Sequence, residues 1–219
     1  MNRRKKKFIK FVLKKKVLQF GQFKLKSGRI SPYFFNSQFL YSGYDIFKLS
    51  QFYAYSIIHS KISFNRLFGL AYKGIPLVSS TAIALKIIYN LNIKYAFNRK
   101  EHKLYSDSGI IVGKELIKQK IIIIDDVITA GLTIQENIKH LNQKNIISGI
   151  FVAFDRKEKG ILKKNSTHQE IHQQHNCKIF SIINVIDLIQ YLKEKNTKKE
   201  ELKNLLLYYK KYGSKKIPI

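Results

Sequence analysis

The stretch from Ile121 to Thr133 combines residues that could bind a phosphorylated sugar. Four isoleucines are followed by Asp125 and Asp126, and then by a small-residue segment that opens a helix. A β-branched run is typical of a parallel strand buried on both faces, and ligands of open α/β sheets bind where such strands end. The two carboxylates would repel a phosphate, so we expect them to bind sugar hydroxyls. The next segment would offer backbone N–H groups and hydroxyls to a phosphate: Val127, Ile128, Thr129, Ala130, Gly131, Leu132 and Thr133. An ordinary strand-to-helix turn is the alternative.

Cations in two other segments could neutralise further phosphate groups. Lys73 follows a short apolar stretch and precedes Gly74. Arg99, Lys100 and Lys103 stand close together at the start of a polar segment. This spacing is typical of a lid that closes over an anionic ligand, and a solvated surface loop is the alternative.

A third group of residues could bind a flat ring that carries a carboxylate. Phe34 and Phe35 can cover a ring, although a strand alternates its faces, so one of them should pack into the core. Arg156 offers a guanidinium fork that suits a carboxylate. A structural pair between Arg156 and the adjacent Asp155 is the alternative.

The elements that must position these residues alternate along the chain. We expect strands at residues 32–35, 66–69, 94–97, 120–124, 146–154 and 178–183. We expect helices within 1–20, at 43–59, from about 75 to 88, and at 132–142, 168–175, 185–195 and 198–212. Residues 98–113 are predicted to be a polar loop. Strands alternating with helices indicate an α/β protein with a parallel sheet.

The segment around Asp125 resembles the phosphoribosyl-diphosphate-binding motif of type I phosphoribosyltransferases. Similarity extends from about residue 8 to 212 and favours the orotate phosphoribosyltransferase branch. It is carried by the segments Lys24–Arg29, Ser31–Asn36, Ala71–Pro76, Asn98–Lys103 and Phe154–Arg156. The resemblance implies one domain: a small N-terminal hood (about 1–40), a parallel-sheet core flanked by helices (about 60–185) and C-terminal helices (about 185–212). It also implies transfer of a phosphoribosyl group to orotate, giving orotidine 5′-phosphate and pyrophosphate in pyrimidine (UMP) biosynthesis.

The resemblance assigns roles to individual residues. The implied catalytic residues are Lys73, Lys100, Lys103 and Asp125. The implied contacts of phosphoribosyl diphosphate add Lys26, Tyr72, Arg99, Tyr105, Asp126 and residues 127–133. The implied orotate contacts are Lys26, Phe34, Phe35, Thr129 and Arg156. Mg²⁺ would arrive on the substrate without direct protein ligands, and a homodimer would share a lid loop of about residues 99–109 between subunits.

Two positions depart from the family pattern. Tyr105 stands where the lid usually has histidine; it can donate a hydrogen bond but carries no charge at neutral pH. His102 is a candidate substitute. The phosphate loop reads Thr-Ala-Gly-Leu-Thr where this branch commonly has Thr-Ala-Gly-Thr-Ala, so the second hydroxyl moves to Thr133.

The net charge of +27 makes an anionic partner worth considering. Lysine supplies 35 of the 41 basic residues, which are dispersed along the chain, and Ile and Asn are also abundant. Lys, Ile and Asn share AT-rich codons, so compositional drift is the preferred interpretation. We expect a cytoplasmic protein with no specific nucleic-acid partner and no membrane contact. The open alternatives are a phosphoribosyltransferase for another base, and a non-catalytic phosphoribosyl-diphosphate sensor that binds nucleic acid.

Two further features carry no predicted chemistry. The single cysteine, Cys177, excludes a disulfide framework and is expected to pack in the core. His168, His172 and His175 share a helical face, but no fourth ligand is evident, so we expect surface histidines and no metal site.

Overall fold

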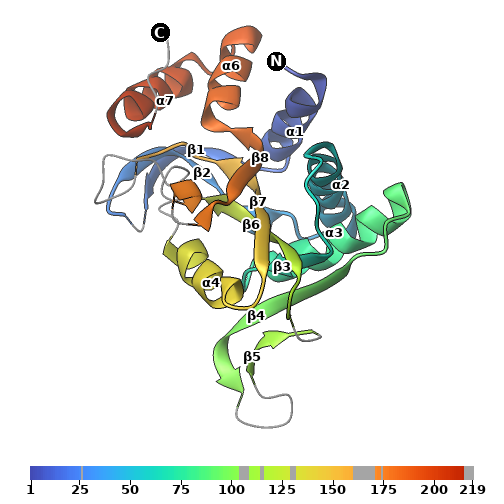
Figure 1. The fold of residues 1–219 in the computed structure, drawn as a ribbon. Coiled ribbons are helices and arrows are strands. Elements are labelled where there is room, and N and C mark those ends of the chain that lie inside the picture. Colours follow the sequence, from blue (N-terminus) through green and yellow to red (C-terminus); the bar gives the residue numbers. More distant parts are fainter. Residues whose placement is uncertain are drawn as a thin grey trace.

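A six-stranded sheet forms the centre of the protein in a computed structural model (Figure 1). The structure describes residues 1–25, 27–103, 109–113, 116–128, 132–159, 171–173 and 175–214. The strands lie in the order β5-β4-β3-β6-β7-β8, and all neighbours are parallel except the antiparallel pair β4–β5. Their bounds are β3 Arg66–Gly69, β4 Lys94–Lys103, β5 Gly109–Val112, β6 Lys120–Ile128, β7 Ile146–Asp155 and β8 Lys178–Asn184. The expected α/β fold with a central, mainly parallel sheet is confirmed.

Helices cover both faces of this sheet, because the buried strands are apolar on both sides. Ile122 and Ile124 of β6 join one core cluster with residues of α2 and α3, while Ile121 and Ile123 join another with α4. The helices are α1 Arg3–Lys14, α2 Gly43–His59, α3 Gly74–Tyr89, α4 Leu132–Asn142, α6 Val185–Lys195 and α7 Lys199–Tyr212. Among the described helices, none has the length and apolar character needed to cross a bilayer.

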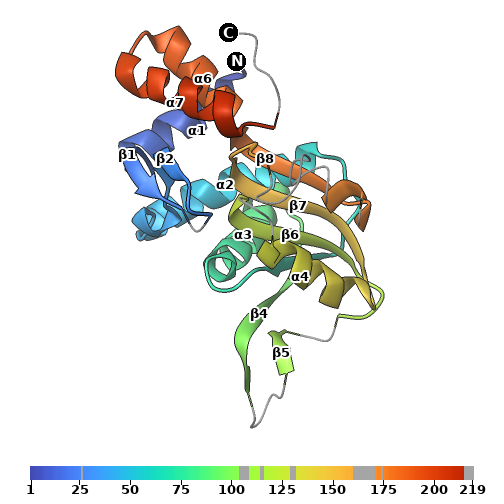
Figure 2. The same cartoon turned by 90° about the vertical axis from the view of Figure 1, so that its left-hand side faces the viewer.

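A small antiparallel pair lies beside the main sheet, next to α1 and α7 (Figure 2). It consists of β1 Leu18–Lys24 and β2 Ile30–Phe35, and a short 3-10 helix, η1 Ser37–Phe39, follows it. The first helix was expected within residues 1–20. The helix ends at Lys14, and Leu18 instead pairs with Phe35 in this two-stranded sheet.

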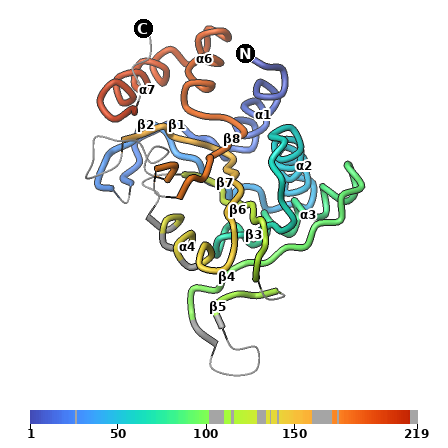
Figure 3. The backbone as a smooth tube through the Cα atoms, in the orientation of Figure 1, coloured from blue at the N-terminus to red at the C-terminus, as the bar shows by residue number. Residues whose placement is uncertain are grey.

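The predicted polar loop at 98–113 is wrong for most of its length. β4 continues to Lys103, and β5 pairs back along it, with Phe97 opposite Val112 and Lys103 opposite Gly109. This hairpin extends away from the body of the sheet (Figure 3). β4 is polar beyond Phe97 and lacks the alternation of a half-buried strand, and β5 has four residues, so hydrophobic periodicity could not reveal the hairpin.

Candidate active site

The two acids at the carboxyl end of β6 have different surroundings. Asp126 is 5% exposed; its Oδ2 accepts hydrogen bonds from Ser37 Oγ at 2.7 Å and Lys73 Nζ at 2.8 Å. Its Oδ1 accepts the N–H of Val127 at 2.9 Å. Asp125 Oδ1 accepts the N–H of Asp126 at 2.9 Å, and its backbone carbonyl accepts Tyr53 Oη at 2.7 Å. Asp126 is therefore bound by protein groups on both oxygens, whereas Asp125 is engaged less fully.

The acid–base character of Asp125 follows from its position. Burial, and then the charge of the neighbouring Asp126, raise the pKa of Asp125 to about 7, although Lys73 and the Asp126 N–H oppose that rise. Both effects disfavour a second negative charge at the strand end. A ligand that brings hydrogen-bond donors or positive charge to Asp125 would favour its ionised form.

Lys73 is brought to the acids by a close approach between two glycines. A Cβ on Gly74 would lie 2.8 Å from the carbonyl oxygen of Ile124 and 2.9 Å from the carbonyl carbon of Gly69. The end of β3 and the start of α3 can therefore touch the end of β6, and the intervening segment is held there. That segment contains a cis peptide bond between Ala71 and Tyr72.

β4 adds a second cation on the same side. Asn98 Oδ1 accepts the N–H of Ala71 at 2.8 Å, and Lys100 Nζ lies 4.8 Å from the ring centroid of Tyr72. Residues 98 and 100 share a face of the strand, so both side chains meet the Ala71–Lys73 segment.

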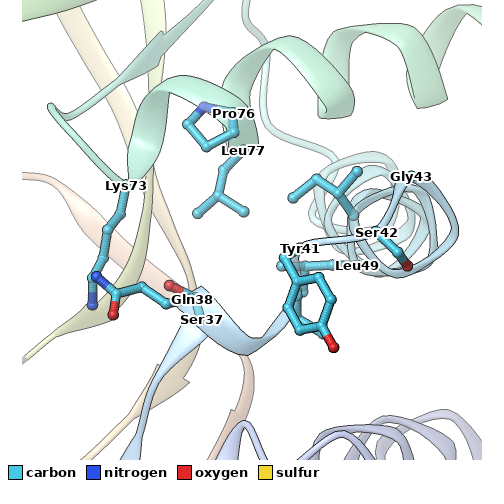
Figure 4. Close-up of a pocket in the computed structure, with 11 residues that line it drawn as sticks. Ser37, Gln38, Tyr41, Ser42, Gly43, Leu49, Lys73, Pro76 and Leu77 are labelled. Atoms are coloured by element: carbon cyan, nitrogen blue, oxygen red, sulfur yellow. The ribbon is translucent and has the colours of Figure 1, made fainter.

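A cavity of about 410 Å³ adjoins Lys73 and Ser37 (Figure 4). Lys73, Ser37 and Gln38 gather at one end, and Ser42 and Gly43 at the start of α2 lie at the other. Its remaining lining is mainly apolar: Leu40, Tyr41, Ile46, Leu49, Pro76 and Leu77. The sequence offered no signal for Ser37 or Tyr53, since a lone hydroxyl far from the motif carries no recognisable pattern.

The aromatic pair of β2 divides between the surface and the core. Phe35 is 3% exposed and stacks on Phe154 at 5.5 Å, whereas Phe34 is half-buried and stacks on Phe23 at 5.4 Å. The expectation that one of the two packs inward is confirmed. Phe34 is therefore the better placed of the two to cover a ligand ring.

Arg156 is enclosed by Glu158 and by side chains of β2 and α7. It is 2% exposed; its Nη2 donates to Ser31 Oγ at 2.8 Å, and its guanidinium lies 4.1 Å from the Tyr33 ring centroid. Its ion-pair partner is Glu158, at 2.8 Å, while Asp155 pairs with Lys157 at 3.1 Å. The structural alternative of an Arg156–Asp155 pair is thus replaced by a different pairing.

Several predicted site residues lie outside the described residues: Lys26, Tyr105, Thr129, Ala130 and Gly131. Lys103 belongs to β4 and Leu132 and Thr133 to α4, but only their backbone is described. α4 begins at Leu132, four residues after β6 ends at Ile128, so the predicted order of strand, acids, short connection and helix is present.

Cys177 takes no part in this site. It is 1% exposed within a core cluster, and burial raises the pKa of its thiol to about 12. The thiol is therefore kept protonated and unreactive, as expected for a core cysteine.

Comparison with known proteins identifies the family. A phosphoribosyl transferase domain model matches residues 40–182. The chain is 54% identical over 210 residues to an orotate phosphoribosyltransferase of Buchnera aphidicola subsp. Acyrthosiphon pisum (strain Tuc7), covering 95% of this chain and 98% of that one. It is 44% identical over 207 residues to the orotate phosphoribosyltransferase of Pseudoalteromonas translucida (strain TAC 125), covering 94% and 96%.

A solved structure agrees with these relatives. The crystal structure of orotate phosphoribosyltransferase from Francisella tularensis superposes with a TM-score of 0.83 at 39% identity, covering 94% of this chain and 99% of that one. The chain therefore belongs to the phosphoribosyltransferase family and, within it, to the orotate phosphoribosyltransferases.

Proposed function

We propose that this protein transfers the 5-phosphoribosyl group of phosphoribosyl diphosphate to orotate, giving orotidine 5′-phosphate and pyrophosphate. The observation that carries the proposal is the meeting of Asp125, Asp126 and Lys73 at the end of β6, directly before the connection to α4. Carboxylates for the ribose, a cation for the diphosphate and a helix N-terminus for the 5′-phosphate match the three parts of this substrate.

In the proposed reaction, the bond between C1 of the ribose and the diphosphate oxygen breaks as a ring nitrogen of orotate bonds to C1. The electron pair leaves with pyrophosphate, the proton of that ring nitrogen passes to pyrophosphate or solvent, and the sugar becomes oxocarbenium-like, as in glycoside cleavage. Lys73 and Lys100 would stabilise the departing negative charge. Asp125 would accept hydrogen bonds from a ribose hydroxyl and oppose the positive charge that develops on the sugar.

Other proposed contacts follow the family motifs. Residues 127–133 would hold the 5′-phosphate, with Tyr72, Arg99, Lys103 and Tyr105 near the diphosphate. Lys26, Phe34, Thr129 and Arg156 would hold orotate, with Phe34 covering the ring and Arg156 facing the carboxylate.

The residues at the strand end fit a Mg²⁺ ion that is held mainly by substrate. Mg²⁺ in phosphate sites usually takes one or two carboxylates together with phosphate oxygens and water. Both oxygens of Asp126 already accept hydrogen bonds from protein groups. Asp125 is therefore the carboxylate of this pair with more capacity left for a ligand. When bound, Mg²⁺ would reduce the negative charge of the leaving diphosphate.

A homodimer that shares the lid loop of residues 99–109 is part of the proposal. Ile83 and Ile87, one turn apart on α3, are 55% and 66% exposed, and Tyr95 of β4 is 42% exposed. Large apolar side chains gathered on neighbouring elements are typical of an interaction surface. We propose that Arg99, at the start of the shared lid loop, serves the partner subunit. A cytoplasmic location stays a prediction.

The proposal is tested by turnover and by Lys73→Met. The wild-type protein should consume orotate with phosphoribosyl diphosphate and Mg²⁺, and should discriminate against bases without a carboxylate. Lys73→Met should lower kcat by about 100-fold, because the cation at the leaving group is lost. Orotate consumption can be followed by ultraviolet absorbance.

Lys203→Met is the matched control, since Lys203 is exposed on α7, away from Lys73 and from the exposed face of α3. It should leave kcat within about twofold of the wild type. A wild-type protein that turns over no orotate, or a Lys73→Met variant with full kcat, would contradict the proposal.

A further inference from the structure

We propose that Glu158 is a positioning residue that orients Arg156 toward the orotate carboxylate and joins it to Arg29 of the hood. The inference rests on the proposed function. Glu158 lies two residues beyond Arg156, on the segment that leaves β7, and none of the sequence motifs singled it out.

Each oxygen of Glu158 is bound by a different arginine. Oε1 accepts Arg156 Nε at 2.8 Å, and Oε2 accepts Arg29 Nη1 at 3.1 Å. The side chains of Glu158, Arg156 and Arg29 are 8%, 3% and 15% exposed. One carboxylate thus bridges two guanidinium groups in a site from which water is largely excluded, where charged hydrogen bonds are least screened.

The remaining contacts of Arg156 leave one nitrogen for a ligand. Nη2 donates to Ser31 Oγ at 2.8 Å and approaches Tyr208 Oη at 3.5 Å, while the guanidinium plane rests over Tyr33. Within the described part of the chain, Nη1 makes no hydrogen bond. Glu158 holds the Nε edge, so the opposite end of the fork is the part that can meet a carboxylate.

Glu158 is itself fixed by the end of α7. It forms a β-bridge with Gly213, flanked by Lys159 N–H to Tyr212 O at 2.9 Å and Ser214 N–H to Lys157 O at 2.8 Å. Because its backbone is held by these hydrogen bonds, the Glu158 carboxylate has little freedom to move with the Arg156 side chain. The arginine is therefore positioned by the carboxylate.

Arg29 extends the same network to the segment between β1 and β2. The Leu25 N–H donates to Arg29 O and the Gly28 N–H donates to Leu25 O, both at 2.9 Å, so Arg29 is joined to the end of β1. Arg29 also donates to Lys159 O at 3.1 Å and lies over the Tyr212 ring. Glu158 consequently connects Arg156 to the segment between β1 and β2.

The test is Glu158→Gln, which keeps the shape and removes the charge. A glutamine can accept from one arginine, but its amide would present N–H groups to the other. We expect KM for orotate to rise about tenfold or more, with KM for phosphoribosyl diphosphate changed by less than about threefold. The ratio of Kd for uridine 5′-phosphate to Kd for orotidine 5′-phosphate, which differ only in the carboxylate, should fall by a similar factor.

Glu201→Gln is the matched control, because Glu201 forms an exposed ion pair with Lys198 at 3.0 Å on α7. It should leave both constants unchanged. Thermal unfolding shows whether each variant is folded. A merely structural defect would alter both KM values together, whereas a lost positioning role would alter the KM for orotate.

If Glu158→Gln does not fold, Arg29→Met tests the same network, because it leaves the Glu158–Arg156 pair in place. It should raise KM for orotate alone, by about threefold or more. Two results in the variant that folds would overturn the inference. One is orotate binding that is unchanged or tighter, and the other is an equal change in both KM values. A wild-type protein without orotate turnover would instead overturn the proposed function.

Discussion

Asp125 and Asp126 are neighbours of the same type that the fold places in different chemical environments. Asp126 is held by Ser37, Lys73 and the Val127 N–H, so it fixes the position of the Lys73 ammonium group. Asp125 has the raised pKa and fewer protein partners. At the residue scale, we infer that Asp126 positions Lys73 and that Asp125 meets the sugar.

This division predicts how Asp125→Asn changes stability with pH. The folded protein holds the Asp125 proton up to a pKa of about 7, whereas the unfolded chain releases it near the ordinary value of 3.8. Between these values the folded state binds more protons, so this group's contribution to the free energy of unfolding falls as pH rises. The contribution is complete below about pH 4 and lost above about pH 7.

Asp125→Asn should therefore be more stable than the wild type above pH 7, by about 1–3 kcal/mol, with the difference shrinking toward pH 4. Urea unfolding of both proteins across this pH range measures it. A stability difference that does not vary with pH would show that Asp125 titrates normally in the folded protein. Turnover by this variant should fall, because the amide cannot oppose charge on the ribose.

At the element scale, the site depends on how closely α3 approaches the sheet. The Gly69–Gly74 contact lets the segment that carries Lys73 rest against the end of β6. Asn98 of β4 then bonds the same segment at Ala71. Three strands and one helix therefore meet at the functional end of the sheet.

Gly74→Ala should disturb this junction. Its Cβ would meet the backbone of Ile124 and Gly69, neither of which can rotate away as a side chain can. We expect the free energy of unfolding to fall by about 2 kcal/mol or more. The KM for phosphoribosyl diphosphate should rise, because Lys73 moves with the helix. Urea unfolding and steady-state kinetics measure the two effects.

Gly43→Ala is the control, because a Cβ at the start of α2 would have no atom within 4 Å. It should be neutral or stabilise by up to about 1 kcal/mol. Equal stability of the two alanine variants would refute the close-approach argument.

At the scale of the whole molecule, charge and apolar surface lie in different places. The protein has a net charge of +27, and some of its lysines form ion pairs between the α1 region and the rest of the protein. These pairs are Lys5–Asp187, Lys6–Glu194 and Lys15–Asp45. Helix α3, which carries the exposed isoleucines, packs against β4, the strand that continues into the projecting hairpin (Figure 1). This placement favours subunit contact through α3 and the hairpin.

Ile87→Glu should therefore produce a monomer with reduced turnover, because a charge would be buried in the proposed interface and Arg99 would lose its partner site. Sedimentation measures the mass, and kinetics the activity. Leu207→Glu is the control, as Leu207 is 59% exposed on α7, far from the hairpin. A wild-type monomer with full activity, or a dimeric Ile87→Glu variant, would contradict the proposed dimer.

Much of the fold could be predicted from the sequence because local patterns specify it. The helices Gly43–His59 and Val185–Lys195 and the strand Arg66–Gly69 have the expected bounds. The isoleucine run before Asp125 is buried on both faces of the sheet, as its composition predicts. The hairpin that continues through Lys103 escaped prediction, because β4 is polar beyond Phe97 and β5 is a run of four residues too short to show a period.

The sequence by itself determined the α/β class, the order of strand, acids and helix, and the family resemblance, since these depend on neighbouring residues. Only the tertiary structure decided that Ser37 and Lys73 share one oxygen of Asp126, and that Glu158 bridges Arg156 and Arg29. A pair with the adjacent Asp155 was the structural alternative for Arg156, whereas its ion-pair partner in the structure is Glu158. The physical reason is that hydrogen bonds and ion pairs join groups far apart in the chain, whose meeting depends on how the layers pack.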